Sequence, residues 1–89
     1  MIAKKIIFAG NVQGVGFRFT AHGIARHWEL TGFVRNLPDG SVEIFAQGRA
    51  EDIDGCLSAI GEAFAGSIRE TRIEETDPDD TYKDFKITF

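Results

Sequence analysis

Two stretches of the chain repeat apolar residues at the spacing of one helix face. The first contains Phe17, Ala21, Ile24, Ala25 and Trp28. The second contains Ile53, Cys56, Leu57, Ile60 and Phe64. This periodicity predicts two amphipathic helices, the first running from Phe17 to about Leu30. Gly55 and Gly61 lie inside the second helix, and each is expected to weaken it by about 1 kcal/mol relative to alanine.

Other segments alternate apolar and polar residues, or are rich in β-branched and aromatic residues, which favours strands. The predicted strands are Lys4–Val12, Thr31–Asn36, Ser41–Gly48 and Ile68–Glu75. Proline and glycine in "LPDG" indicate a tight turn between the second and third strands. After an acidic loop, "TDPDD", the closing segment "YKDFKITF" alternates Phe85, Ile87 and Phe89 and indicates a further strand.

The order of elements is therefore βαββαβ, with an extra strand possible near the end. Two helices with one apolar stripe each, and strands with one apolar face, predict a two-layer α+β sandwich. The ferredoxin-like arrangement is the closed form of that order, with an antiparallel sheet and both helices on one face. A chain of 89 residues fits one such domain, residues 1–89.

Composition and charge narrow the classes of function. The formal net charge is −4 at pH 7, which argues against a general nucleic-acid-binding protein. Residues 1–49 carry six basic and three acidic side chains, whereas residues 50–89 carry four and eleven. No apolar run approaches the roughly 20 residues of a membrane span. A single cysteine, Cys56, cannot form an internal disulfide, so we expect a cytoplasmic protein.

The stretch "GNVQGVGFRF", residues 10–19, lies in the basic half and joins the first strand to the first helix. Glycines there allow positive φ angles and close approach of a ligand to the backbone. The first amides of the helix lack internal partners and lie at the positive end of its dipole, so the turn can hold a phosphate or carboxylate. Arg18 adds a planar guanidinium that can bind two anion oxygens. The Rossmann and Walker nucleotide patterns both fail here, the former because Phe19 replaces its third glycine.

"GNVQGVGFR", followed eighteen residues after its arginine by the asparagine of "GFVRNLPDGSVE", resembles the acylphosphatase family. The resemblance covers nearly the whole chain. It implies a small cytosolic, cofactor-free and metal-free hydrolase of acyl phosphates with a ferredoxin-like fold. It further implies that Arg18 binds the phosphate and that Asn36 orients the attacking water. The expected phosphate-binding loop consists of Gln13, Gly14, Val15, Gly16, Phe17 and Arg18.

The expected partner is a small-molecule acyl phosphate, with phosphate or sulfate as competing anions. Neither nucleic acid nor membrane is expected as a partner, and we expect a monomer. A non-catalytic anion-binding regulatory module of the same fold is an alternative. A single-stranded RNA binder is another, since Phe8, Phe33 and Phe45 are candidates for base stacking, although the net charge argues against it.

Four other features are interpreted as structural. "DPDDT", residues 77–81, matches the motif of aspartate-nucleophile phosphatases, but no buried strand precedes it, which favours a solvated loop. Cys56 lies on an apolar helix face and is expected in the core. His22 and His27 are five residues apart and are expected on the surface as poor metal partners. Arg35 is expected to point to the opposite face of the sheet from Asn36.

Overall fold

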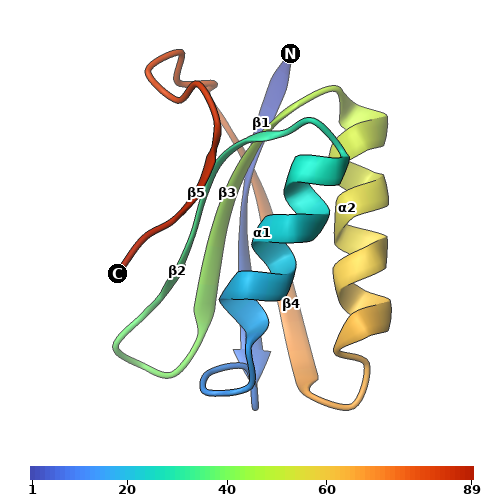
Figure 1. Cartoon of the computed structure of the whole chain (residues 1–89), viewed down its shortest axis with the longest axis vertical. Helices are drawn as coiled ribbons and strands as arrows, with labels where there is room; N and C mark the ends of the chain where they lie inside the picture. Colours follow the sequence, from blue (N-terminus) through green and yellow to red (C-terminus); the bar gives the residue numbers. More distant parts are fainter.

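The computed structural model describes all of residues 1–89 and contains two helices and one five-stranded sheet. The elements are β1 (Ile2–Gly10), α1 (Phe17–His27), β2 (Thr31–Asn36), β3 (Val42–Gly48), α2 (Ala50–Ala63), β4 (Ile68–Thr76) and β5 (Phe85–Ile87). The strand order is β4-β1-β3-β2-β5, and both helices cover the same face of the sheet (Figure 1). This architecture confirms the predicted two-layer ferredoxin-like α+β fold.

The sheet is mixed, which corrects the expectation of a purely antiparallel one. The pairs β1–β3, β1–β4 and β2–β3 are antiparallel, but β5 runs parallel to β2. The reason is the path of residues 77–84, which carries the chain from β4 at one edge of the sheet to β5 at the other. In this register Val34 of β2 lies beside Ile87 of β5, so the last residues of the chain continue toward Asn36.

The core lies between the sheet and the helices. It comprises fifteen buried residues, namely Ile6, Phe8, Val12, Phe17, Ala21, Ala25, Leu30, Val34, Val42, Ile44, Ala46, Ile53, Cys56, Ile60 and Phe85. Within each strand these residues alternate with residues of the open face, as expected for a sheet with one covered side. Phe8 packs on Phe17 with ring centroids 5.3 Å apart, which fixes the start of α1 against β1. Neither helix has the length and apolar content needed to cross a membrane.

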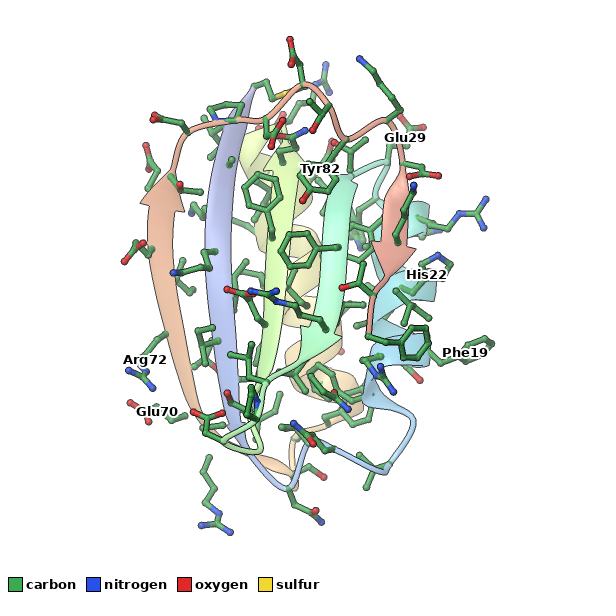
Figure 2. All side chains as sticks on the ribbon, turned by 90° about the vertical axis from the view of Figure 1, so that its left-hand side faces the viewer. Phe19, His22, Glu29, Glu70, Arg72 and Tyr82 are labelled. Atoms are coloured by element: carbon green, nitrogen blue, oxygen red, sulfur yellow. The ribbon has the colours of Figure 1, made fainter.

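The open face of the sheet is partly covered by the chain itself. Phe33, Phe45 and Tyr82 pack together with ring centroids 5.4–5.8 Å apart, and Tyr82 lies over the sheet in Figure 2. The side-chain amide of Gln47 donates to the Asp79 carbonyl and accepts from the Asp79 N–H, both at 2.8 Å. Because Phe8 is buried in the core while Phe33 and Phe45 pack against Tyr82 on the opposite face, the three phenylalanines considered for base stacking do not form one exposed platform.

Helix α1 ends three residues before the predicted boundary. Glu29 has a left-handed backbone with φ 59°. The N–H of Leu30 donates to the Ala25 carbonyl, and that of Glu29 donates to the Arg26 carbonyl. These two bonds form a Schellman motif, which satisfies the last carbonyls of the helix and turns the chain toward β2. The apolar periodicity of the sequence extends beyond the helix to Leu30, because the Leu30 side chain still packs in the core.

The two glycines of α2 differ in their surroundings. A Cβ atom on Gly55 would lie 2.5 Å from the indole of Trp28, whereas one on Gly61 would meet nothing within 4 Å. Gly55 therefore provides room for Trp28 to pack against the helix. Only Gly61 matches the sequence-based prediction that each glycine merely lowers the stability of the helix.

Substituting alanine at these two positions is expected to have opposite effects on stability. Gly61→Ala should raise the free energy of unfolding by up to about 1 kcal/mol through better helix propensity. Gly55→Ala should lower it by about 1 kcal/mol, because displacing the indole outweighs that gain. Urea unfolding measures both effects. Trp28 is the only tryptophan, so its emission should shift to longer wavelength in Gly55→Ala alone; an unchanged spectrum there would contradict the packing argument.

Candidate active site

The loop between β1 and α1 leaves several backbone amides free. Gly14 and Gly16 both have φ 77°, a left-handed conformation that glycine adopts without strain. Gly16 is the N-cap of α1 and provides no side-chain cap. None of the amides from Gln13 to Gly16 donates to a backbone carbonyl, and the first helical amides have no partner within the helix. The loop thus presents donors beside the positive end of a helix dipole.

Arg18 lies in the first turn of α1 and is half-buried. Its Nη1 donates to the Thr88 carbonyl at 3.3 Å, and its guanidinium lies 4.6 Å from the centroid of the Phe89 ring. Neither the Thr88 carbonyl nor the Phe89 ring carries a negative charge. The five ion pairs of the structure all involve other residues, so the Arg18 guanidinium makes no ion pair within the chain and is available to an external anion.

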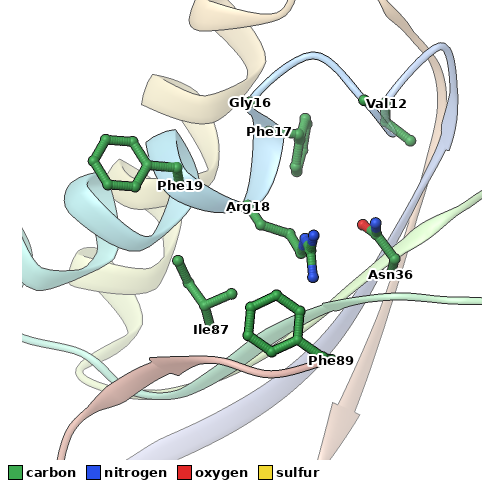
Figure 3. A pocket seen from close by; sticks show the side chains of 9 residues that line it. Val12, Gly16, Phe17, Arg18, Phe19, Asn36, Ile87 and Phe89 are labelled. Atoms are coloured by element: carbon green, nitrogen blue, oxygen red, sulfur yellow. The ribbon is translucent and has the colours of Figure 1, made fainter.

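Asn36 is the last residue of β2 and faces the helix side of the sheet. Its neighbour Arg35 points to the open face, as predicted, where its Nε donates to Glu43 Oε1 at 2.5 Å. Glu43 is only 6% exposed because this pair covers it. Figure 3 shows the Asn36 amide facing the guanidinium of Arg18 across the pocket.

These features meet in one pocket of about 280 Å³. It is lined by Val12, Gly14, Gly16, Phe17, Arg18, Phe19, Asn36, Ile87 and Phe89. The structure thus brings together Arg18 and Asn36, and four of the six predicted loop residues line the pocket, while Gln13 and Val15 do not. Arg18 and Asn36 are its only polar side chains, so it contains no side chain able to transfer a proton at neutral pH.

Sequence reasoning missed Val12, Phe19, Ile87 and Phe89 as lining residues. The alternation of Ile87 and Phe89 indicated that they share a face, but no local signal shows that β5 lies beside β2. Phe19 directly follows Arg18 in the sequence and is 76% exposed. Phe19 does not belong to the apolar stripe of α1, and this was the one sequence feature that could have indicated a large apolar side chain outside the core.

The side chain of Gln13 has a structural role that the sequence analysis did not predict. Its Nε2 donates to the carbonyls of Leu37 and Ser41, at 2.8 and 2.9 Å. These carbonyls belong to the turn between β2 and β3, and the Leu37 N–H donates to the same Ser41 carbonyl at 2.9 Å. The Gln13 side chain therefore joins the β1–α1 loop to the turn that follows Asn36. It sets the spacing between that loop and Asn36, which lie on opposite sides of the pocket.

The same turn is stabilised by Asp39. The Ser41 hydroxyl donates to Asp39 Oδ1 at 2.5 Å and the Ser41 N–H donates to it at 3.0 Å. These bonds hold the pKa of the Asp39 carboxyl below its ordinary value, the hydroxyl having the larger effect. Because the folded-state pKa is depressed, this contribution to stability is present above the unfolded-state pKa and is lost as the pH falls through the folded-state one.

Removing the amide donors of Gln13 is expected to lower both stability and turnover of an anion substrate at this pocket. Gln13→Met keeps the length of the side chain but removes its two bonds, at a cost of about 1–3 kcal/mol in unfolding free energy. Asn36 then loses its fixed distance from the loop, so kcat should fall more than KM rises. The matched control is Gln47→Met, which removes a similar amide link to Asp79 at the other end of the sheet. It should lower stability without changing kcat, and an equal loss of kcat in both variants would show that Gln13 acts through stability alone.

The alternative chemical features lie elsewhere. Cys56 is buried, and burial raises the pKa of its thiol to about 12, so it is no nucleophile at neutral pH. Asp79 accepts from the hydroxyl and the N–H of Thr81 in the exposed loop over the open face. His27 is exposed, which confirms its predicted place on the surface, and His22 is only partly exposed and lies near Phe85.

Comparisons with known proteins agree with one another. The profile of the Acylphosphatase family matches residues 4–87. A relative from Archaeoglobus fulgidus named acylphosphatase is 38% identical, and one of the same name from Bacillus licheniformis is 41% identical; each alignment covers 100% of both chains. The crystal structure of acylphosphatase from Bacillus subtilis superposes with a TM-score of 0.90 at 32% identity and covers 100% of both chains. On the family profile, the full-length relatives and the shared fold, the chain belongs to the acylphosphatase family.

Proposed function

We propose that this chain hydrolyses acyl phosphates to a carboxylate and inorganic phosphate in the pocket between the β1–α1 loop and the end of β2. The observation that carries the proposal is the meeting of an uncompensated guanidinium, free backbone amides and a non-titrating amide side chain in one pocket. Family membership supplies the reaction class. The roles of the individual residues follow from their chemistry.

The phosphoryl group binds against the loop. Amides from Gln13 to Arg18 hold its oxygens, with Arg18 beside them. The fixed dipoles of the amides and the cation of Arg18 then stabilise the negative charge of these oxygens, which is the principal requirement of phosphoryl transfer. The contacts of Arg18 with Thr88 and Phe89 hold the guanidinium in place before the substrate arrives, so little ordering is needed on binding.

Asn36 positions the attacking water. Its amide carries both a donor and an acceptor, so it can hold a water without changing its own protonation state. The water oxygen forms a bond to phosphorus while the bond from phosphorus to the acyl oxygen breaks. The acyl oxygen leaves with the electron pair as carboxylate, and both protons of the water end on the phosphate.

This reaction needs neither a strong general acid nor a cofactor, because a carboxylate is a good leaving group. That argument supports a mechanism in which Arg18 and the loop amides supply the positive charge themselves. Inorganic phosphate and sulfate compete for the same donors. The chain acts as a monomer in the cytoplasm, a location consistent with its single buried cysteine, and it needs no nucleic acid or membrane.

The test is release of inorganic phosphate from acetyl phosphate, with a phosphate monoester as the comparison and a chelator in both reactions. We expect turnover of acetyl phosphate that survives chelation and little turnover of the ester, whose alkoxide is a poorer leaving group. A folded protein that binds phosphate but hydrolyses neither compound would be a regulatory anion-binding module instead.

A further inference from the structure

A second pocket lies on the open face of the sheet, away from Asn36 and the β1–α1 loop. It has a volume of about 290 Å³ and is lined by Phe33, Arg35, Tyr82, Thr88 and Phe89. We call it the open-face pocket. Phe89 lines both pockets, but the other four residues line the open-face pocket alone. A space of this size lies at the small end of the range for ligand sites and fits a compound of one or two rings.

Three aromatic rings from separate segments surround this pocket. Phe33 belongs to β2, Tyr82 lies between β4 and β5, and Phe89 follows β5. The rings of Phe33 and Tyr82 lie 5.7 Å apart at an angle of 42°, and Tyr82 lies over the sheet in Figure 2. Aromatic side chains around an open space favour a planar ring as ligand, because ring contacts add to the area that is buried.

Hydrogen bonds hold the walls of the pocket in place without a ligand. Gln47 binds both backbone groups of Asp79, and the Tyr82 N–H donates to the Asp79 carbonyl at 3.3 Å. These bonds fix the segment that carries Tyr82 to β3. The Thr88 N–H donates to the Val34 carbonyl at 2.9 Å, which fixes the residues after β5 to β2. The pocket is therefore formed in advance, so little loss of conformational freedom opposes binding.

The polar groups of the pocket are available to a ligand. The Nε of Arg35 donates to Glu43, and the Arg35 guanidinium lies 5.4 Å from the centroid of the Phe33 ring. No side-chain hydrogen bond of the chain involves the Nη groups of Arg35 or the hydroxyls of Tyr82 and Thr88. The side chain of Arg35 is 48% exposed. Unused donors thus lie beside an aromatic wall, an arrangement that orients an aromatic ligand with an acceptor.

The charge of the pocket favours a neutral ligand. Arg35 is the only charged residue in its lining, and Glu43, which is 6% exposed beneath it, balances that charge. An anion would lose hydration here without meeting a net positive charge, whereas a carbonyl oxygen needs only a donor. The pocket of Arg18 differs in this respect, because the Arg18 guanidinium makes no ion pair within the chain.

We propose that the open-face pocket binds a neutral, planar aromatic compound that carries a carbonyl acceptor, as an aromatic amide does. The ring of the ligand packs against Phe33, Tyr82 and Phe89, and its carbonyl oxygen accepts from the Nη groups of Arg35. This site lies outside the one proposed for acyl phosphates, and binding to it does not depend on hydrolysis.

The first experiment titrates the isotope-labelled wild type with benzamide and follows the backbone amide resonances by NMR. The resonances of Phe33, Arg35, Tyr82 and Thr88 should shift with one common Kd, while those of α2 should not move. Shifts confined to residues of the Arg18 pocket, or no saturable shift, would overturn the proposal. Because the readout is binding, the result is independent of whether the chain hydrolyses acyl phosphates.

Two related compounds test the chemical class of the ligand at the same resonances. Cyclohexanecarboxamide carries the same amide on a saturated ring and should bind about threefold to tenfold more weakly, the scale of lost aromatic contacts. Benzoate keeps the planar ring but is charged, and it should also bind more weakly than benzamide. Equal affinities of benzamide and cyclohexanecarboxamide would contradict the aromatic site, and tighter binding of benzoate would contradict the preference for a neutral ligand.

Three variants test the contacts. Tyr82→Leu keeps an apolar side chain but removes the ring and hydroxyl, and it should lower the affinity for benzamide by about tenfold. Arg35→Lys keeps a positive charge beside Glu43 but loses the planar fork, and it should lower the affinity by about fivefold. Phe19→Leu removes a ring that is 76% exposed but lies outside the open-face pocket, so the affinity should not change. Unchanged affinity in Tyr82→Leu or Arg35→Lys, or an equal loss in Phe19→Leu, would overturn the site.

Discussion

Replacing Arg18 with glutamine is expected to lower kcat/KM for acetyl phosphate by about a thousandfold or more, the scale of losing a guanidinium that stabilises a transferring phosphoryl group. The glutamine amide keeps a donor but not the charge. Arg18 makes no ion pair within the chain, and its guanidinium is held by the Thr88 carbonyl and the Phe89 ring, so its charge is free to act on the substrate. Inorganic phosphate should bind more weakly as well, because in the proposed mechanism the guanidinium contacts the same oxygens before and during the reaction. Steady-state kinetics and phosphate titration by calorimetry measure the two losses.

Two companion variants make this result interpretable. Arg26→Gln removes a cation from the exposed side of the same helix and should leave kinetics unchanged. Arg18→Lys keeps the charge but loses the planar fork, so its activity should fall between that of the wild type and that of Arg18→Gln. Activity of Arg18→Gln within about tenfold of the wild type would remove Arg18 from the phosphate site.

Replacing Asn36 with alanine is expected to lower kcat by about a hundredfold to a thousandfold, the usual effect of deleting a positioned polar group. Phosphate affinity should change little, because Arg18 and the loop amides remain in place. The separation between lost turnover and retained binding distinguishes a water-positioning residue from a phosphate-binding one. The measurements are kcat for acetyl phosphate and the Kd of inorganic phosphate.

Two further variants serve as controls for Asn36→Ala. One removes an asparagine elsewhere in the chain, and the other replaces the Asn36 amide by a carboxylate. Asn11 is the only other asparagine, and it is exposed in the loop after β1. Asn11→Ala should leave kcat unchanged. Asn36→Asp places a carboxylate beside the bound anion and should weaken phosphate binding as well as turnover. Full activity of Asn36→Ala would show that another group holds the water.

Much of the fold could be predicted because its elements have strong local signals. The periodic apolar residues of α1 and α2 define helices, and the "LPDG" turn joins β2 to β3 as predicted. The position of β5 could not be predicted, because parallel pairing with β2 across the sheet depends on contacts far apart in sequence. Gly55 was misinterpreted for the same reason: its neighbour is Trp28, the residue that follows the last residue of α1.

The candidate site was predictable where chemistry is local. Gly14, Gly16 and Arg18 are close in sequence and have recognisable properties, and Asn36 was found through the resemblance of its motif. The partners of Arg18 were not found, because Thr88 and Phe89 reach it only through the β2–β5 pairing. The side chain of Gln13 was not recognised as a link, since an amide between two backbone carbonyls leaves no pattern in the sequence.

The most direct test of the central claim is hydrolysis of acetyl phosphate by the wild type in water enriched in heavy oxygen, with a chelator present. The central claim is that a water held by Asn36 attacks phosphorus while Arg18 and the loop hold the phosphoryl group. We predict turnover well above the buffer rate, with the heavy oxygen incorporated into inorganic phosphate and absent from acetate. Label in acetate would mean attack at the carbonyl carbon, and turnover no faster than in buffer would mean that the pocket binds its anion without hydrolysing it; either result would contradict the claim.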